Sequence, residues 1–326
     1  MRERAGESRL KIWLLLAANR LYVTGLLALA VFVLFVVLVS VLPEPLVPQL
    51  QGADTVETMF SGIIGAVITG VTLVVTISQL VLSQENGPLG EQRDRMENSM
   101  DFRDYSEELI GTPSPADPSA FLRNLVDESE KRANAVRDGL SEVENEQLRW
   151  EVDQFTESLI GNSETVREQL DGARFGSFDV LFAALNYNYS WKIFQVERLL
   201  HDHDEDLGDP ENRLLNELKS ALTMFGPARE HVKTLYFEWA LTSLSQMILY
   251  AAVPALVVAA VMVAGVSGSV FPGSTFGIAH IAVVVGVAFT VTMVPFLLFI
   301  SYVLRIVTVA KRTLAIEPLI LRDSQR

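Results

Sequence analysis

Four long apolar runs interrupt an otherwise polar chain, at about residues 21–42, 59–82, 244–270 and 276–304. None of them contains a Lys, Arg, Asp or Glu. About 20 consecutive apolar residues are enough for an α-helix to cross the hydrocarbon core of a bilayer. The pattern therefore predicts four transmembrane helices.

The segment between the second and third runs shows a different pattern. Its apolar residues recur at helical spacing, as in Leu122, Leu125 and Val136, and no stretch alternates convincingly as a strand would. The predicted fold class is all-α: a polytopic membrane protein with four transmembrane helices and a helical cytoplasmic domain between spans 2 and 3. We divide the chain into an N-terminal arm (1–20), transmembrane helices 1 and 2 (21–83), an acidic helical domain (84–242), transmembrane helices 3 and 4 (243–304) and a tail (305–326).

Glycine and proline indicate where the helices end. Gly87-Pro88 predicts a break after the second span, followed by a polar helix at about 89–110. Helical patterns are expected at about 121–160, with Gly139 as a candidate interruption, and at about 177–200. A long helix that enters the third span is expected to begin after Gly226-Pro227.

The basic residues predict the orientation. All 26 Lys and Arg fall in the N-terminal arm, the central segment or the tail, and the short loops at 43–58 and 271–275 have none. Cytoplasmic loops are the ones enriched in Lys and Arg. We therefore expect a multi-pass protein of the cell membrane, with both termini and the central domain in the cytoplasm.

The central domain is strongly acidic. Residues 84–242 hold 33 Asp plus Glu against 16 Lys plus Arg, and the whole chain has 6 Lys, 20 Arg and no Cys. Such a charge disfavours nucleic acid as a partner and leaves membrane lipid as the expected surroundings of the apolar runs. An acidic, Lys-poor surface favours a halophilic archaeon as the source; the alternative is an ordinary acidic cytoplasmic domain.

A stripe of small and polar residues with a seven-residue repeat runs through the second span. Its members are Thr55, Thr58, Gly62, Gly65, Thr69, Thr72, Thr76, Gln79, Ser83, Asn86 and Gly90. Spacing of three and four places them on one face of a helix. From Gly62 to Ser83 the helix rises about 32 Å, roughly the thickness of the hydrocarbon core.

Two uses of this stripe stay open, separately or together. Gly, Ser and Thr let helices pack closely in lipid, and the same face could line a water-filled pore. One four-span chain has too few helices to surround a path along one helix face, so a pore requires a homo-oligomer. Asp54 and Glu57 at the outer mouth and Glu85 at the inner mouth would then weakly favour cations.

The sequence gives weaker indications of metal binding and of catalysis. His201, Asp202, His203, Asp204 and Asp206 form the densest candidate metal site, and a divalent cation there is an alternative to a solvated acidic loop. The spacing begins like a calcium loop, but the glycine and the bidentate glutamate of that motif are replaced. No phosphate-binding loop, nucleophile elbow or thiol indicates an enzyme, and no cofactor is expected.

Part of the second span resembles a group of uncharacterised prokaryotic four-span membrane proteins, which we expect to be haloarchaeal. The resemblance is carried by Phe60-Ser61-Gly62, Ala66-Val67-Ile68-Thr69, Ser78-Gln79-Leu80-Val81-Leu82-Ser83-Gln84 and Pro88. Leu89 departs from that pattern, which has Arg after the proline.

The topology is also similar to that of bestrophin channels, with paired spans around a helical cytoplasmic domain. Bestrophins line a pentameric pore with the second span, so this resemblance implies a pentamer here by analogy. Their neck aromatics and acidic calcium clasp have no matching motif in this chain.

These observations favour a homo-oligomeric ion channel with a pore lined by the second span, a cytoplasmic helical vestibule or gate, and inorganic ions as substrates. The alternative is a non-conducting membrane scaffold or sensor. Its acidic domain would bind a protein partner, and the stripe would pack the helix bundle.

Overall fold

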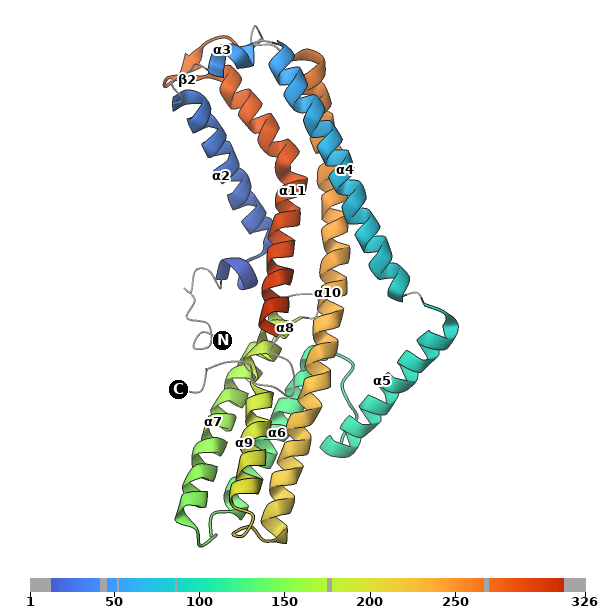
Figure 1. The fold of residues 1–326 in the computed structure, drawn as a ribbon, viewed down its shortest axis with the longest axis vertical. Helices are drawn as coiled ribbons and strands as arrows, with labels where there is room; N and C mark the ends of the chain where they lie inside the picture. The colour runs from blue at the N-terminus through green and yellow to red at the C-terminus, as the bar shows by residue number, and fades with distance from the viewer. Residues whose placement is uncertain are drawn as a thin grey trace. The chain divides into compact units, whose positions relative to one another are not determined.

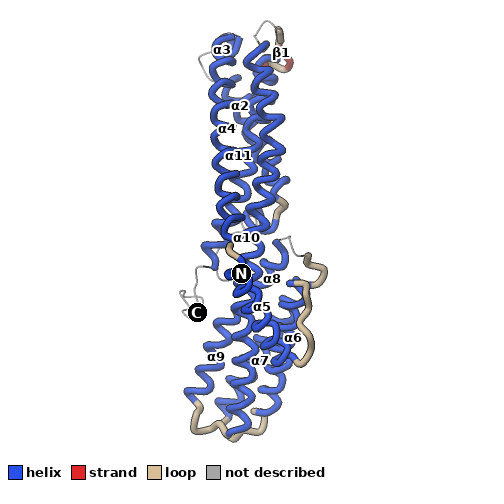
Figure 2. Tube along the Cα trace, turned by 90° about the vertical axis from the view of Figure 1, so that its right-hand side faces the viewer, coloured by secondary structure: helices blue, strands red, loops and turns tan. Residues whose placement is uncertain are grey.

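The computed structural model describes residues 13–41, 46–51, 53–85, 87–174, 178–266 and 270–313. These residues are almost entirely helical, which confirms the all-α class (Figures 1 and 2). The elements in chain order are the π-helix η1 (Trp13–Ala17), α2 (Arg20–Val41), α3 (Leu46–Gln51), α4 (Ala53–Glu85), α5 (Leu89–Ile110), α6 (Pro118–Gly139), α7 (Glu146–Leu170), α8 (Phe178–Asn186), α9 (Tyr189–Asp202), α10 (Asp209–Gly265), β1 (Ser274–Thr275), β2 (Ile278–Ala279) and α11 (His280–Thr313).

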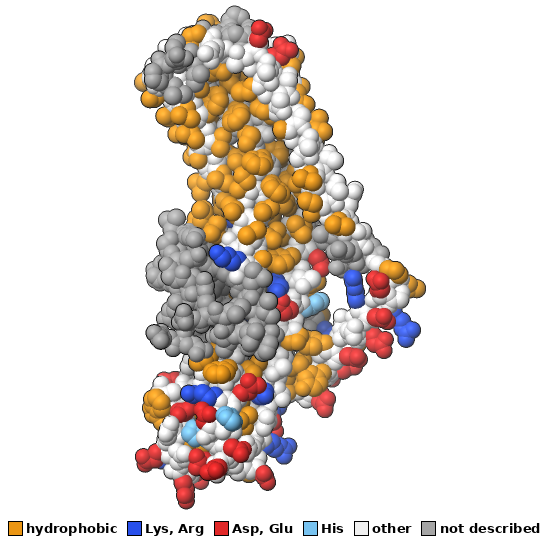
Figure 3. Space-filling model, in the orientation of Figure 1, with side chains coloured by type: hydrophobic (Ala, Val, Ile, Leu, Met, Phe, Trp, Pro, Cys, Tyr) orange, Lys and Arg blue, Asp and Glu red, His pale blue; other side chains and the backbone are white. Residues whose placement is uncertain are grey.

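The chain forms two compact units. The apolar unit comprises the described residues within 10–86 and 239–308, and the polar unit those within 87–238 and 309–313. Four helices are long and apolar enough to cross a membrane: α2, α4, α11 and the C-terminal part of α10. Figure 3 shows orange apolar side chains over the apolar unit and charged side chains gathered on the polar unit.

In the apolar unit, α2 packs closely on α11. A Cβ atom built on Gly286 of α11 would lie 3.0 Å from the Phe35 ring and 3.3 Å from Val36, both on α2. Next to this contact, the rings of Phe35 and Phe289 stack with centroids 5.4 Å apart. The missing side chain of Gly286 is what lets the two helices approach.

The polar unit is built around one apolar core. Helices α6, α7, α8 and α9 and the first part of α10 contribute buried residues such as Leu125, Leu159, Val180 and Leu222. The Tyr187 ring lies 4.6 Å from that of Phe225, centroid to centroid. This contact joins the turn between α8 and α9 to α10.

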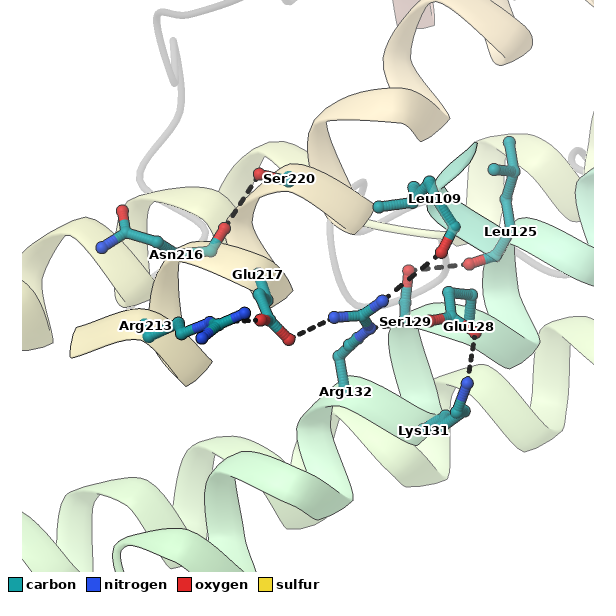
Figure 4. Close-up of polar contacts among 10 residues, drawn as sticks. All are labelled: Leu109, Leu125, Glu128, Ser129, Lys131, Arg132, Arg213, Asn216, Glu217 and Ser220. Carbon is teal, nitrogen blue, oxygen red and sulfur yellow. Dashed lines mark hydrogen bonds and ion pairs between the residues drawn. The ribbon is translucent and has the colours of Figure 1, made fainter. Parts of the chain in front are cut away.

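One ion-pair network ties three helices of the polar unit together (Figure 4). Glu128 on α6 is buried and accepts a hydrogen bond of 2.6 Å from Nε of Arg132. The same guanidinium pairs with Glu217 on α10 and donates to the Leu109 carbonyl of α5 at 3.4 Å. The pKa of Arg132 is raised, chiefly because the Glu128 carboxylate accepts a hydrogen bond from its guanidinium.

The break at Gly87-Pro88 and the polar helix at 89–110 are confirmed, since α5 begins at Leu89 and ends at Ile110. The interruption at Gly139 is also confirmed, because α6 ends there. Asn145 then starts α7 by accepting hydrogen bonds from the backbone N–H groups of Gln147 and Leu148. A single helix across 121–160 is therefore replaced by two.

Two other expectations were wrong. The expected helix at 177–200 is divided into α8 and α9 at Tyr187-Asn188, where Tyr187 turns into the core. No new helix begins after Gly226-Pro227, because α10 runs through both residues. Pro inside a helix costs about 3 kcal/mol, but burial of the flanking Phe225 and Ala228 compensates.

The structure also contains a small hairpin that the sequence pattern did not predict. Thr275 pairs with Ile278, and Ser274 pairs with Ala279. Two residues per strand are too few to show alternation in a sequence. Backbone conformation, with positive φ at Phe276 and Gly277, makes this turn.

Candidate functional site

The stripe on α4 lies on the accessible side of the helix. Every one of its members from Thr55 to Ser83 is exposed in the isolated chain. The opposite face of α4 carries the residues buried against the other helices of the unit. Figure 3 shows a white band, the colour of Gly, Ser, Thr and Gln, along this edge of the apolar unit.

Apolar contacts at both ends attach α4 to its own chain. Val56 and Phe60 belong to one buried cluster with Ala259 of α10 and Val285 of α11. A second cluster joins Val74 to Leu244, Ile248 and Leu298. Between α4 and α10 the hydroxyls of Ser78 and Ser245 also meet. These contacts turn the stripe away from α10 and α11.

The glycines of the stripe face open space. A Cβ atom built on Gly62 or Gly65 would meet nothing within 4 Å. Gly286 on α11 differs, because its Cβ would touch α2. Gly62 and Gly65 therefore do not serve close packing within one chain, and in a membrane this face would meet lipid, water or another copy.

Three hydroxyls of the stripe donate to carbonyls of the helix itself. Thr72 donates to the Ile68 carbonyl and Thr76 to the Thr72 carbonyl, each at 2.8 Å, and Ser83 donates to Leu80 at 2.7 Å. A hydroxyl that bonds to its own helix still has an oxygen free to accept. Gln79 differs, because its amide has donors and acceptors that a helix backbone leaves unmet.

The charged residues at the two ends of α4 are only partly described. Asp54 and Glu57 are exposed in the first turns of the helix, as a mouth charge would require. Glu85 is the last residue of α4, and its side chain lies outside the described residues, as does Asn86. Gly90 is exposed but belongs to α5.

Comparison with known proteins assigns the whole chain to one protein family. Residues 1–326 match a family described as a family of unknown function, DUF7972. The chain belongs to the DUF7972 family. No curated protein and no solved structure matches it. The expected resemblance to bestrophins finds no support in these comparisons.

In the candidate metal site of this DUF7972 protein, at residues 201–206, the histidine His203 is buried. His203 has Glu151 Oε2 3.9 Å from Nε2 and Asp206 Oδ2 3.6 Å from Nδ1, so the two carboxylates lie on opposite sides of the ring. One ion cannot bind both ring nitrogens and both carboxylates in that arrangement. His201, Asp202 and Asp204 are exposed, and within the described ranges no three His, Asp or Glu side chains group as metal ligands.

The sequence analysis did not predict a polar cluster that the apolar unit contains. Arg20 is buried and donates to the carbonyls of Leu14, Ala18 and Ser301 at 2.7–3.1 Å. Arg305 is buried as well and also donates to Ala18. Beside them the Thr24 and Ser301 hydroxyls are 3.1 Å apart. The position of Arg20 directly before an apolar run is a signal that could have indicated burial.

Proposed function

We propose that this DUF7972 protein is a homo-oligomeric ion channel whose pore is lined by the α4 stripe. The observation that carries the proposal is that the α4 stripe, from Thr55 to Ser83, is exposed and not covered by the described part of its own chain. Several copies arranged around an axis would bring these faces together around water. The amide of Gln79 and the oxygens of the threonines would then contact permeating ions.

The proposed channel sits in the cell membrane with the polar unit and both termini in the cytoplasm. The distribution of Lys and Arg supports this orientation. Exposed aromatic residues next to the apolar spans, at Trp13, Tyr22 and Trp239, support a position in a membrane without indicating its direction. Trp and Tyr concentrate at membrane interfaces because their rings are apolar and their N–H and O–H groups are polar.

The ion selectivity of such a pore would be low. The stripe itself contains no charge, so its lining would consist of hydroxyls, amides and glycine backbone. Asp54 and Glu57 would make one mouth negative, and Glu85 the other. This favours cations at low salt, whereas at about 1 M salt the screening length falls to about 3 Å and the preference weakens.

Conductance in planar bilayers tests the proposal. The purified protein should conduct, and Thr72→Trp should abolish or strongly reduce the current because an indole on each copy would fill a narrow axis. Val257→Trp is the matched control, since this residue of α10 is exposed and lies outside the stripe. Absence of conductance under varied salt, calcium and membrane tension, in a verified oligomer, contradicts the channel.

Access of water to the stripe gives a second test. The natural sequence has no Cys, so an introduced Cys is the one thiol that can react. A charged thiol reagent should modify Thr76→Cys in the membrane. It should leave Ile77→Cys unmodified, because Ile77 is also exposed but turned about 100° around the helix.

One observation favours the alternative of a non-conducting scaffold or sensor. The hydroxyls of Thr72 and Thr76 already donate to their own helix, so they can lie in a dry contact between copies. In that case Thr76→Cys cross-links between copies but resists the charged reagent. The acidic polar unit would then act by binding a protein partner.

A further inference from the structure

The hairpin β1–β2 is fixed to the start of α11. The backbone N–H of His280 donates to the Gly273 carbonyl at 3.0 Å, and Nε2 of its ring lies 2.8 Å from the Thr275 hydroxyl. On the other side, Ala279 packs against a buried apolar cluster of the same unit. Pairing of the two strands satisfies backbone groups of the hairpin within the chain, which suits a loop that lies next to lipid.

The tip of this hairpin carries a large apolar side chain that the described part of the chain does not cover. Phe276 is 100% exposed, and Val270, which precedes the hairpin, is 54% exposed. The φ of Phe276 is 52°, a conformation that Gly or Asn adopts more easily than Phe. Strain that persists at an exposed aromatic side chain indicates a role outside the packing of the fold.

The length of α11 places the hairpin at the level of the lipid headgroups. Arg305 is the first charged residue of this helix, and the helix rises about 37 Å between His280 and Arg305. The hydrocarbon core of a bilayer is about 30 Å thick, and the bilayer with its headgroups about 40–45 Å. With Arg305 at the inner edge of the core, the hairpin lies in the outer headgroup layer.

The connection that contains the hairpin carries no charge. No Lys, Arg, Asp or Glu occurs from residue 239 to residue 304, whereas the other outer connection, at 43–58, contains Glu44, Asp54 and Glu57. Carboxylates favour water, and an exposed Phe next to an apolar span favours the lipid interface. β2 contacts α2, and Figure 1 shows the hairpin on the side of the apolar unit away from α4. An oligomer that assembles through the α4 stripe therefore leaves the hairpin facing lipid.

We propose that the hairpin β1–β2 anchors the outer end of the apolar unit to the bilayer surface, with the Phe276 ring inserted at the boundary between headgroups and acyl chains. Aromatic and apolar side chains of interfacial segments reach about 5–10 Å into this boundary. The partner is the lipid surface. The inference rests on the membrane location in the proposed function and is independent of the pore.

Collisions of a spin label with two reagents test the position of the hairpin. Phe276→Cys, Val257→Cys and Asp54→Cys of the full-length protein each carry one thiol, because the natural sequence has none. Each variant is labelled with a nitroxide and reconstituted into vesicles of phosphatidylcholine and phosphatidylglycerol. Oxygen concentrates in lipid and a nickel chelate stays in water. Val257, exposed within the third span, gives the value for lipid, and the exposed Asp54 gives the value for water.

We expect the ratio of oxygen to nickel collisions at position 276 to exceed that at position 54 several-fold. A ratio equal to that at position 54 overturns the anchor. A label at position 276 that is shielded from both reagents also overturns it, because a protein surface then covers the tip. A water-like ratio at position 257 overturns the membrane location and the anchor together, whereas a lipid-like ratio there with a water-like ratio at position 276 overturns the anchor alone.

A second label position keeps the native ring in place. Ser274→Cys lies in the same hairpin and is exposed. Its label should collide with the nickel chelate at least about twofold more often when Phe276→Asn is added, because the hairpin loses its anchor. Asn suits positive φ, so the turn itself is retained. Unchanged collisions would show that the Phe276 ring does not hold the hairpin at the membrane.

Discussion

At the scale of single residues, the polar unit contains a buried carboxylate whose burial is offset by ion pairs with basic side chains. Glu128 is 5% exposed, and Arg132 and Lys131 both bond to it. Removing one partner of a buried pair leaves an uncompensated charge, which costs far more than loss of a surface pair. The two basic partners differ in burial, so their contributions can be separated.

Arg132→Ala is expected to lower the free energy of unfolding by about 3 kcal/mol, because Glu128 loses its buried partner. Lys131→Ala should change it by less than about 0.5 kcal/mol, since the Lys131 side chain is 70% exposed. Urea unfolding followed by far-UV circular dichroism measures both. Similar effects of the two substitutions would show that Arg132 does not stabilise Glu128.

A buried tyrosine side chain, Tyr187, makes the polar unit less stable at high pH. Burial raises the pKa of Tyr187 to about 12, while the facing Ser129 and Ser163 hydroxyls lower it by less. The unfolded phenol ionises near pH 10, so the folded state keeps a proton that the unfolded state loses. This contribution to stability is complete below about pH 10 and is lost as the pH rises towards 12.

Tyr187→Phe should therefore make the free energy of unfolding less dependent on pH between about 10 and 12. The difference in slope should approach about 1.4 kcal/mol per pH unit. Tyr105→Phe is a control for tyrosine ionisation in general, because this side chain of the polar unit is 51% exposed. Parallel pH profiles for wild type and Tyr187→Phe would contradict a raised pKa.

At the scale of elements, the hairpin before α11 contains a strained turn. Phe276 has φ 52° and Gly277 has φ 79°, and together they form the two-residue turn between β1 and β2. Positive φ at both central positions favours Asn-Gly. The Phe276 side chain is 100% exposed, so it gains no packing within the described chain that would offset the strain.

Phe276→Asn is expected to stabilise the protein by about 0.5–1 kcal/mol through relief of this backbone strain. Thermal unfolding in detergent measures the effect. Phe276→Val serves as the control, because a β-branched residue at positive φ should destabilise the turn. A loss of stability in Phe276→Asn would show that the aromatic ring contributes a contact outside this chain.

At the scale of the whole molecule, the strong negative charge predicts that the stability of the protein depends on salt. The chain carries a net charge of −14, and residues 84–242 supply 33 of its acidic side chains. Repulsion among them destabilises the compact state, and salt screens it.

The midpoint of thermal unfolding should rise between about 0.1 M and 1 M KCl as the screening length falls from about 10 Å to 3 Å. Each kcal/mol of stabilisation corresponds to about 2–4 °C in a domain of this size. Sucrose at equal osmolality is the control, because it favours compact states without screening charge. Equal gains in KCl and sucrose would argue against charge repulsion.

How far the sequence determines this molecule depends on the range of the interactions involved. Apolar runs, the uncharged stripe of α4 and the break at Gly87-Pro88 follow from residues close together in the chain. Helical spacing and the missing N–H of proline act within a few residues, so a pattern alone predicts their effects. The sequence by itself thus determined four apolar spans, an all-α fold and a polar face on the second span.

Only the tertiary structure decided which helix faces are covered. Tyr187 ends α8 because it packs on Phe225, which lies far away in the chain, and burial around Pro227 keeps α10 unbroken. The attachment of α4 through Phe60 and Val74 likewise leaves its stripe exposed. Such outcomes depend on contacts between distant residues, whose free energies exceed the local preferences that a sequence pattern records.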